Sequence, residues 1–281
     1  FDIINVLAID DKGGYFYYIA SPENPLQRYL FRSKLNGEGK PEKLSPDEQK
    51  GTHRYSISPN YKWAVHSFSN ANTPPVHEII SLPDHKQVRL LEDNGALKAR
   101  LAQLKVNKVE FFKIEIEKGI CLDGYMIKPN DFDPTKKYPV FFNIYGEPAG
   151  TTVNDSWGIS MWHYFLSQKG YIIMSIDNRG TPAPKGREWR KSIYGQIGIL
   201  ASKDQAAAVK EILKWDFVDA SRIGIWGWSG GGSMTLNMLF RYPDIYSLGI
   251  SVAPVPDEHL YDTIYQERYM GLPSTNSYGY I

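Results

Sequence analysis

The pattern of apolar residues changes near residue 93, and this change constrains the fold more than any other feature of the sequence. Before it, short apolar runs are separated by segments rich in Asp, Asn, Gly and Pro, which are typical of strands joined by turns. After it, strand patterns alternate with helical patterns, which is typical of an α/β layer architecture. The sequence therefore predicts an all-β region followed by an α/β region.

The all-β region, residues 1–93, divides into two sets of four candidate strands. The sets repeat at a spacing of roughly 45 residues, which is typical of propeller blades. A small β-sandwich is the alternative, but the grouping into fours favours two blades, and two blades cannot close a ring. The candidate strands are Ile3–Ile9, Tyr15–Ser21, Arg28–Leu35, Pro41–Leu44, His53–Ser58, Trp63–Ser69, Val76–Leu82 and Gln87–Leu91.

Residues 94–107 predict a connecting helix, because leucines recur there at helical spacing. Residues 108–281 predict an α/β domain that begins with a hairpin at Lys118-Gly119, and no further element is expected after Ala253. Asp204 is expected in the first turn of a helix, where the helix dipole favours an acid. The expected strands are Val109–Glu117, Ile120–Lys128, Pro139–Tyr145, Tyr171–Asp177, Arg222–Trp226 and Ser247–Ala253, and the expected helices are Ser156–Gln168, Lys203–Trp215 and Gly230–Tyr242.

A serine motif lies between the last expected helix and the strand before it. The residues Gly227-Trp228-Ser229-Gly230-Gly231 fit Gly-x-Ser-x-Gly in a strand–turn–helix context, the nucleophile elbow of α/β-hydrolases. Such a turn exposes the serine hydroxyl above the sheet edge, and its glycines allow strand and helix to approach closely. The following helix N-terminus offers free amides to a developing oxyanion. An ordinary Gly-Ser turn is the alternative, and the context favours catalysis by Ser229.

Tyr145 ends an almost wholly apolar strand and precedes Gly146-Glu147-Pro148. In α/β-hydrolases the loop at this place faces the nucleophile and carries an oxyanion donor. The Tyr145 hydroxyl and the Gly230 backbone amide would then form the oxyanion hole together. A buried tyrosine that only packs at the end of its strand is an equally good interpretation.

Several segments occur in an order that resembles one known family. They are Asn143–Gly146, Asp177–Gly180, the serine motif extended to Gly232, Val252–Val255 and Tyr261–Pro273. Together they resemble the prolyl oligopeptidase family, and in particular its dipeptidyl peptidase IV branch. The all-β region is similar to the last blades of that family's propeller, so the resemblance covers nearly the whole chain.

This resemblance implies a serine exopeptidase that removes N-terminal dipeptides with Pro or Ala at the second position. It implies Ser229 as the nucleophile, with Tyr145 and the Gly230 amide as the oxyanion hole. The expected partner is a peptide with a free N-terminus, and no cofactor is expected. A homodimer is compatible with the resemblance, as is a location in the periplasm or cytoplasm of a bacterium. The residues implied for the proline pocket are Val255, Tyr261 and Tyr265. Aromatic walls suit the flat face of a proline ring. The alternative for these three residues is packing in the core.

Two residues depart from the family pattern. Gly230 stands where many members have a tyrosine, which would leave the pocket wider, and Glu258 stands where some members have a tryptophan. These departures leave open whether dipeptides or tripeptides are released. An oligopeptidase or esterase of other specificity, and a non-catalytic binding protein with the same architecture, are the alternative functions.

A serine nucleophile also needs a base and an orienting carboxylate, which follow it in this fold in the order Asp or Glu, then His. His259 is the histidine that follows Ser229, and its order and spacing disfavour the role of base. We therefore expect the triad Asp and His, and the last strands of the sheet, to lie beyond residue 281. The chain alone is expected to show little or no peptidase activity.

Composition excludes several other classes of protein. Lys and Arg total 32 against 31 for Asp and Glu, so the basic excess of a nucleic-acid or anionic-membrane binder is lacking. The single cysteine, Cys121, cannot form an internal disulfide, and no apolar run is long enough for a membrane span. No metal site is predicted, because ligand spacing is not recognisable around the histidines of the all-β region, which are His53, His66, His77 and His85.

Overall fold

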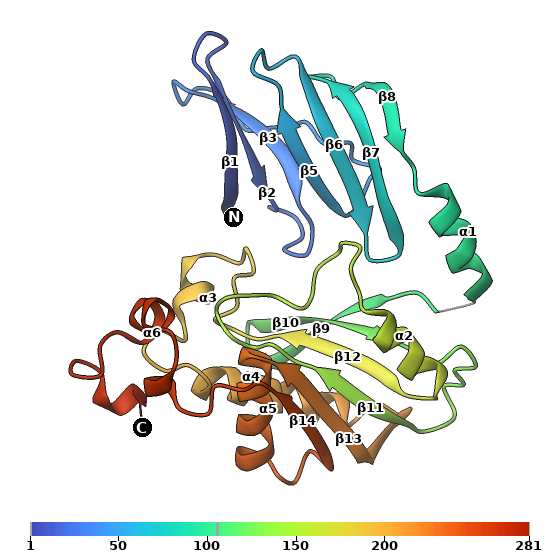
Figure 1. Cartoon of the computed structure of the whole chain (residues 1–281), viewed down its shortest axis with the longest axis vertical. Coiled ribbons are helices and arrows are strands. Elements are labelled where there is room, and N and C mark those ends of the chain that lie inside the picture. Colours follow the sequence, from blue (N-terminus) through green and yellow to red (C-terminus); the bar gives the residue numbers. More distant parts are fainter. Residues whose placement is uncertain (1, 105–106, 281) are drawn as a thin grey trace. The chain divides into compact units, whose positions relative to one another are not determined.

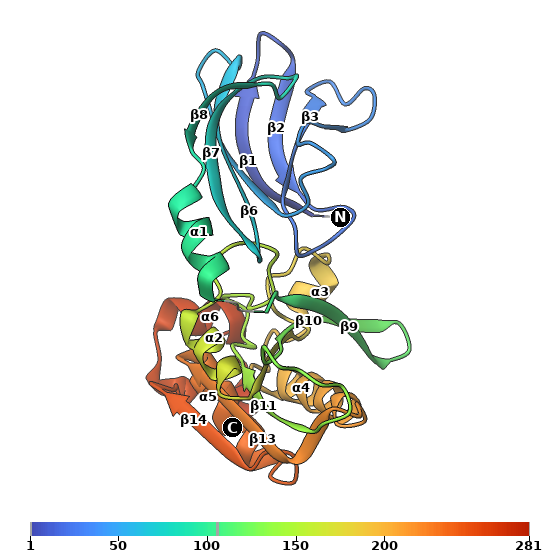
Figure 2. The same cartoon turned by 90° about the vertical axis from the view of Figure 1, so that its right-hand side faces the viewer.

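The computed structural model describes residues 2–104 and 107–280, and it divides into two compact units. The first unit comprises Phe1–Lys105, Asn154–Ile159 and Pro184–Gly186. The second comprises Val106–Val153, Ser160–Ala183 and Arg187–Ile281. Figure 1 labels the elements of both units, and Figure 2 shows the same elements from the side.

The first unit contains two four-stranded sheets, and in each of them the strands follow one another in chain order (Figure 1). The strands within each sheet pair antiparallel, as expected for consecutive strands joined by short turns, and an isolated parallel bridge joins Arg28 to Thr52. Eight strands therefore form where the sequence predicts them. The strands are β1 (Ile3–Asp10), β2 (Tyr15–Ala20), β3 (Tyr29–Lys34), β4 (Glu42–Lys43), β5 (Thr52–Ile57), β6 (Trp63–Asn70), β7 (Thr73–Ser81) and β8 (Gln87–Glu92).

Alternating residues of β2 bury both faces of its sheet. Tyr17 and Ile19 pack in one cluster with residues of both sheets, such as Ile80, while Tyr18 and Ala20 pack in a second cluster on the opposite face. This follows from the two-residue side-chain period of a strand. The first unit therefore owes its core to aromatic and branched side chains that suit sheets.

A segment from the middle of the sequence belongs to the first unit. Asp155 accepts hydrogen bonds from Gln27 Nε2 at 2.8 Å and from the Ala71 amide at 3.0 Å, and its carbonyl accepts one from Thr52 Oγ1 at 2.9 Å. The expected helix Ser156–Gln168 is therefore wrong in its first turn, because these bonds hold residues 154–159 against the strands. Helix α2 (Met161–Gln168) begins only after Ser160, whose side chain caps it.

The second unit contains a six-stranded sheet with the order β14-β13-β11-β12-β10-β9. Strands β12, β11, β13 and β14 are parallel, and β10 and β9 extend the sheet as an antiparallel hairpin. Helices α4 and α5 contact each other and the sheet, while α2 contacts β10 and β12. The strands are β9 (Glu110–Glu117), β10 (Ile120–Ile127), β11 (Tyr138–Asn143), β12 (Ile172–Asp177), β13 (Val218–Trp228) and β14 (Leu248–Val252).

The helices of the chain differ from the prediction at several ends. Helix α1 (Gly95–Leu104) forms as expected, although residues 105 and 106 of the predicted connector lie outside the described residues. The expected absence of structure after Ala253 is wrong, since α6 follows. No helix among residues 2–104 and 107–280 combines the length and the apolar character that crossing a bilayer requires. The remaining helices are α3 (Arg187–Lys191), α4 (Ile199–Ile212), α5 (Gly230–Arg241), α6 (Thr263–Met270) and the 3₁₀ turns η1 (Glu258–Leu260) and η2 (Ser277–Tyr280).

Asp204 does not lie in the first turn of its helix, contrary to the expectation. Helix α4 begins at Ile199, so Asp204 lies within it, with its side chain 1% exposed. Its carboxylate receives the Arg179 amide at 3.0 Å and the Arg179 guanidinium at 3.0 and 2.6 Å. The residue therefore ties α4 to the loop after β12 instead of interacting with the helix dipole.

Candidate active site

Ser229 has a backbone conformation that is rare for a residue with a side chain. Its φ is 57° and its ψ is −121°, between the end of β13 and the start of α5. Positive φ is costly for a non-glycine residue and persists only where the surroundings enforce it. Its amide donates to the Val252 carbonyl at 2.9 Å, which links the turn to the end of β14. The motif therefore forms the strained turn expected of a nucleophile elbow.

Two glycines allow the elbow to close. A Cβ atom at Gly227 would lie 2.6 Å from the Ile144 carbonyl oxygen, well inside van der Waals contact. A Cβ at Gly231 would overlap the same carbonyl oxygen and would lie 3.3 Å from the Tyr145 Cα atom. The start of α5 and the end of β11 are therefore in direct contact, which brings together the two segments that carry the expected oxyanion donors, Tyr145 and Gly230.

The expected nucleophile and oxyanion donor lie at the same edge of the sheet as the ends of the neighbouring strands. Tyr145 follows β11, Asp177 ends β12, Ser229 follows β13 and Val252 ends β14. These four strands are parallel, so their carboxyl ends meet at the same edge. In open α/β sheets, ligands bind at this edge.

The loop after Tyr145 is held by buried polar groups. The Asp177 carboxylate accepts hydrogen bonds from the Thr152 amide at 2.9 Å, the Thr152 hydroxyl at 2.9 Å and the Val153 amide at 3.1 Å. Asn178 Nδ2 donates to the Gly146 carbonyl at 3.0 Å. Burial raises the pKa of Asp177 to about 6 despite these donors. The loop is therefore fixed near both of its ends, by Asp177 at the end of β12 and by Asn178 directly after it.

Tyr145 has the properties of a hydrogen-bond donor at neutral pH. Its pKa is raised to about 12, chiefly by burial and further by the nearby Glu147 carboxyl and the phenol of Tyr261. The phenol therefore keeps its proton. The protonated phenol is the form that can donate a hydrogen bond to the oxyanion of an acyl-transfer reaction.

Glu147 is a site residue that the sequence analysis missed. Its side chain is buried, and one carboxyl oxygen accepts a hydrogen bond from the Tyr265 hydroxyl at 2.8 Å. Burial raises its pKa to about 7, with a smaller contribution from the Glu258 carboxyl. A Cβ atom at Gly230 would overlap this carboxyl group. The Glu147 carboxyl group therefore occupies space beside Gly230 that a side chain at residue 230 would take.

Tyr261 and Tyr265 lie together, as expected. Their ring centroids are 5.4 Å apart, and both line a pocket of about 570 Å³ with Pro148 and Ile264. Val255 lines a different hollow, of about 310 Å³, beside α5. The structure therefore brings the two tyrosines to one pocket and places Val255 at another.

His259 pairs with a neighbouring acid. Its Nδ1 atom lies 2.9 Å from Asp257 Oδ1, and its side chain is 47% exposed. Its ring also packs on Tyr280, with centroids 4.8 Å apart. Within the described part of the chain, no histidine side chain is hydrogen-bonded to Ser229.

A mainly parallel sheet with a strained serine after β13 defines the second unit as an α/β-hydrolase type of fold. Residues 157–280 match the model of the prolyl oligopeptidase family, and residues 1–75 match that of the dipeptidyl peptidase IV N-terminal region. The chain belongs to the dipeptidyl peptidase IV branch of the prolyl oligopeptidase family.

Individual relatives agree with this assignment. A probable dipeptidyl-aminopeptidase B of Metarhizium robertsii is 34% identical over 276 residues, which cover 97% of this chain and 30% of that protein. Dipeptidyl peptidase 4 of Trichophyton equinum is 33% identical over 283 residues, covering 99% of this chain and 36% of that protein. The crystal structure of Porphyromonas gingivalis dipeptidyl peptidase 4 matches with a TM-score of 0.93 and 39% identity, covering 99% of this chain and 39% of that chain. The chain thus spans 30 to 36% of the length of these two curated relatives.

Proposed function

We propose that this protein is a serine exopeptidase that releases dipeptides from peptide N-termini, with Pro or Ala preferred at the second position. The observation that carries the proposal is the positive φ of Ser229, at 57°, in a turn that meets the segment of Tyr145. The similarity to dipeptidyl peptidases supports the choice of substrate. We further propose that the first unit forms blades of this enzyme's propeller and that the second unit is part of its catalytic domain.

In the proposed reaction, Ser229 Oγ attacks the carbonyl carbon of the second residue of the peptide. The resulting oxyanion accepts hydrogen bonds from the Tyr145 hydroxyl and the Gly230 amide. The peptide C–N bond then breaks, the shortened peptide leaves with a proton on its new amine, and the dipeptide remains as an ester of Ser229. Water hydrolyses this ester and releases the dipeptide acid.

The proton of Ser229 needs a base during the attack. We propose that the triad Asp and His lie beyond residue 281, as the chain order of the fold predicts. The pairing of His259 with Asp257 on an exposed 3₁₀ turn supports this placement, since it leaves that histidine with a local partner. The chain of residues 1–281 is accordingly proposed to be inactive by itself.

The pocket supports a small or flat second residue. Tyr261 and Tyr265 provide aromatic walls for a proline ring. The flat ring of a proline at the second position fits such walls, which supports the preference proposed.

The test is labelling of the full-length protein with a fluorophosphonate probe, measured by intact mass. We expect one adduct, which disappears in Ser229→Ala and remains in the control Ser221→Ala, whose serine lies on the same strand and is exposed. The full-length protein should also cleave a Gly-Pro amide and leave its N-acetylated form intact. Cleavage of the acetylated form would indicate an endopeptidase, and an unlabelled full-length protein would indicate a non-catalytic member.

A further inference from the structure

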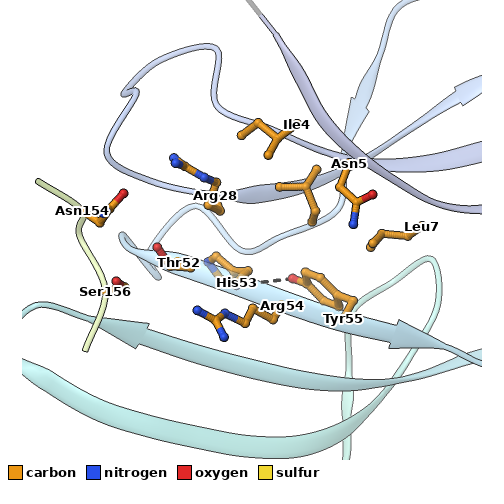
Figure 3. Close-up of a pocket in the computed structure, with 11 residues that line it drawn as sticks. Ile4, Asn5, Leu7, Arg28, Thr52, His53, Arg54, Tyr55, Asn154 and Ser156 are labelled. Carbon is orange, nitrogen blue, oxygen red and sulfur yellow. Dashed lines mark hydrogen bonds between the residues drawn. The ribbon is translucent and has the colours of Figure 1, made fainter. Parts of the chain in front are cut away.

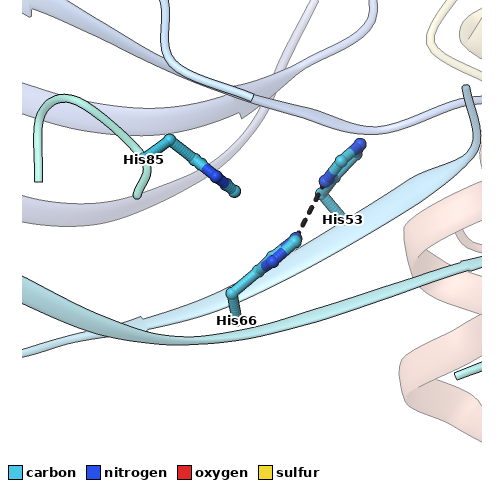
Figure 4. A group of neighbouring side chains, drawn as sticks. All are labelled: His53, His66 and His85. Atoms are coloured by element: carbon cyan, nitrogen blue, oxygen red, sulfur yellow. Dashed lines mark hydrogen bonds between the residues drawn. The ribbon is translucent and has the colours of Figure 1, made fainter. Parts of the chain in front are cut away.

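Three histidines of the first unit converge although they are well separated in the sequence (Figure 4). His53 lies on β5, His66 on β6, and His85 in the turn between β7 and β8. One ring nitrogen from each lies within 4.8 Å of the others. The first two side chains are fully buried, at 1% and 0% exposure. We infer that these histidines form a binding site for a divalent transition-metal ion of the zinc type.

The outer nitrogens of two of these rings face acceptors. His66 Nδ1 lies 2.8 Å from Glu78 Oε1, and the other oxygen of that carboxylate accepts from Gln87 Nε2 at 2.7 Å. His53 Nε2 lies 2.9 Å from the Gln49 carbonyl oxygen. A carboxylate and a carbonyl only accept, so both outer nitrogens carry the proton.

The inner nitrogens of the same two rings therefore face each other as lone pairs. His53 Nδ1 and His66 Nε2 are 2.9 Å apart (Figure 4). Two acceptors at this distance repel each other unless something positive lies between or beside them. An additional proton would create a buried imidazolium ion, which burial disfavours, and it would engage only these two nitrogens.

Further donor atoms surround the same point. The Tyr55 hydroxyl lies 2.9 Å from His85 Nε2, 3.3 Å from His53 Nδ1 and 2.8 Å from Ser45 Oγ. Three imidazoles with a water molecule as the fourth ligand are a donor set that zinc uses in proteins. Three converging nitrogens match a metal ion better than a proton, which bridges two.

The spacing of the nitrogens fits such an ion after a small adjustment. Ligands about 2.1 Å from a tetrahedral zinc ion are about 3.4 Å from one another. The observed separations run from 2.9 Å, between His53 and His66, to a limit of 4.8 Å over the three histidines. Ring movements on the order of 1 Å would bring all three nitrogens to coordination distance.

The surroundings of the rings are those of ligands. Metal-binding histidines usually donate their second N–H to a carboxylate or a backbone carbonyl, which fixes the ring orientation. Glu78 serves His66 in this way, and the Gln49 carbonyl serves His53. The Glu78 carboxylate also supplies negative charge beside the ion, since it is buried within the same sheet.

A pocket gives the ion a route to the histidine cluster (Figure 3). It has a volume of about 510 Å³, and both His53 and Tyr55 line it. Two cationic residues, Arg28 and Arg54, line it as well. The Arg28 guanidinium is engaged by the Pro25 and Gln27 carbonyls at 2.7 and 2.8 Å. We therefore expect the bound ion to exchange slowly with ions in solution, and a small chelator that enters the pocket to remove it.

The test is metal analysis of the purified protein after chelation and dialysis against zinc. We expect one equivalent of zinc per chain, a rise in Tm on zinc addition, and no competition from Mg²⁺, which prefers oxygen ligands. Co²⁺ in place of zinc should give the visible absorption bands of a tetrahedral site. His85→Gln and His66→Gln should weaken zinc binding by at least about 100-fold.

The control variant is His77→Gln, whose histidine lies on β7 outside the cluster and should leave zinc binding unchanged. His85 lies in a turn, so its variant keeps the test valid if His66→Gln fails to fold. Equal zinc binding by His85→Gln and His77→Gln would overturn the inference. The inference would also be overturned if no zinc were bound and if NMR showed a doubly protonated His66 both in the chelated protein and in the protein dialysed against zinc.

Discussion

Ionisation of Glu147 should destabilise the second unit as the pH rises. The side chain is 6% exposed, and its pKa is raised from 4.5 to about 7, mainly by burial. The folded protein therefore favours the neutral acid, whereas the unfolded chain ionises near pH 4.5. The stabilisation is complete below pH 4.5, decreases as the pH rises through 7, and is lost above it. At about 1.4 kcal/mol for each pH unit, the loss approaches about 3 kcal/mol.

The variant Glu147→Gln isolates this effect, because its amide oxygen can still accept from the Tyr265 hydroxyl and never ionises. We expect nearly equal Tm values for variant and parent at pH 4, and a Tm about 6 to 12 °C higher for the variant at pH 8.5. Thermal unfolding followed by circular dichroism measures both. The control Glu188→Gln, at an exposed position of α3, should show the same small difference at every pH. A difference between Glu147→Gln and parent that stays constant with pH would refute the reasoning.

Three further predictions follow from the contacts of the second unit. Tyr145→Phe removes a proposed oxyanion donor, so kcat of the full-length protein should fall by about 10²- to 10³-fold with little change in KM, and a loss below tenfold would exclude the role. Gly230→Ala places a methyl group on the Glu147 carboxyl and should lower stability by about 1 to 3 kcal/mol in urea unfolding. The loss caused by Gly230→Ala should be much smaller in a Glu147→Gly background than in the parent. An equal loss in both backgrounds would contradict the clash. Asp204→Ala removes the buried partner of Arg179, whose guanidinium still lies 2.9 Å from the exposed Glu117 carboxylate, so the free energy of unfolding should fall by about 1.5 to 3 kcal/mol, against less than about 1 kcal/mol for a surface ion pair.

The local pattern of the sequence was sufficient for the strands and for the serine turn. Alternating apolar residues in β2 and the apolar run of β11 are direct consequences of burial on two faces, so their positions could be predicted within a few residues. The Gly-x-Ser-x-Gly motif likewise depends on residues that are neighbours in the chain. Its strained backbone at Ser229 was therefore predictable from the motif.

Long-range polar contacts were not predictable in the same way. Asp155 forms hydrogen bonds with Gln27 and Ala71, which lie far earlier in the chain, so the segment that was expected to begin a helix is held in another conformation. Asp204 bonds to Arg179 across the sheet edge instead of its own helix terminus. No local propensity records such pairings, because the partners meet only once the sheet has formed.

The site residues show the same division. Ser229 and Tyr145 are candidates that motif and chain order suggest, whereas Glu147 is not, because acids are rarely buried and a Glu-Pro step is typical of a surface turn. One usable signal was Gly230, since a glycine beside the nucleophile leaves volume that another side chain must fill. The histidine cluster gave no spacing signal, because register and not sequence distance brings β5 and β6 together.

The overlap between Glu147 and a side chain at residue 230 couples these two positions in this chain. A residue larger than glycine after the nucleophile requires the Glu147 carboxyl group to shift or to be replaced by a smaller side chain. A shifted carboxyl group would give up the hydrogen bond from the Tyr265 hydroxyl. The volume beside the nucleophile is thus shared by two residues that lie far apart in the sequence, and a change at one of them alters the space available to the other.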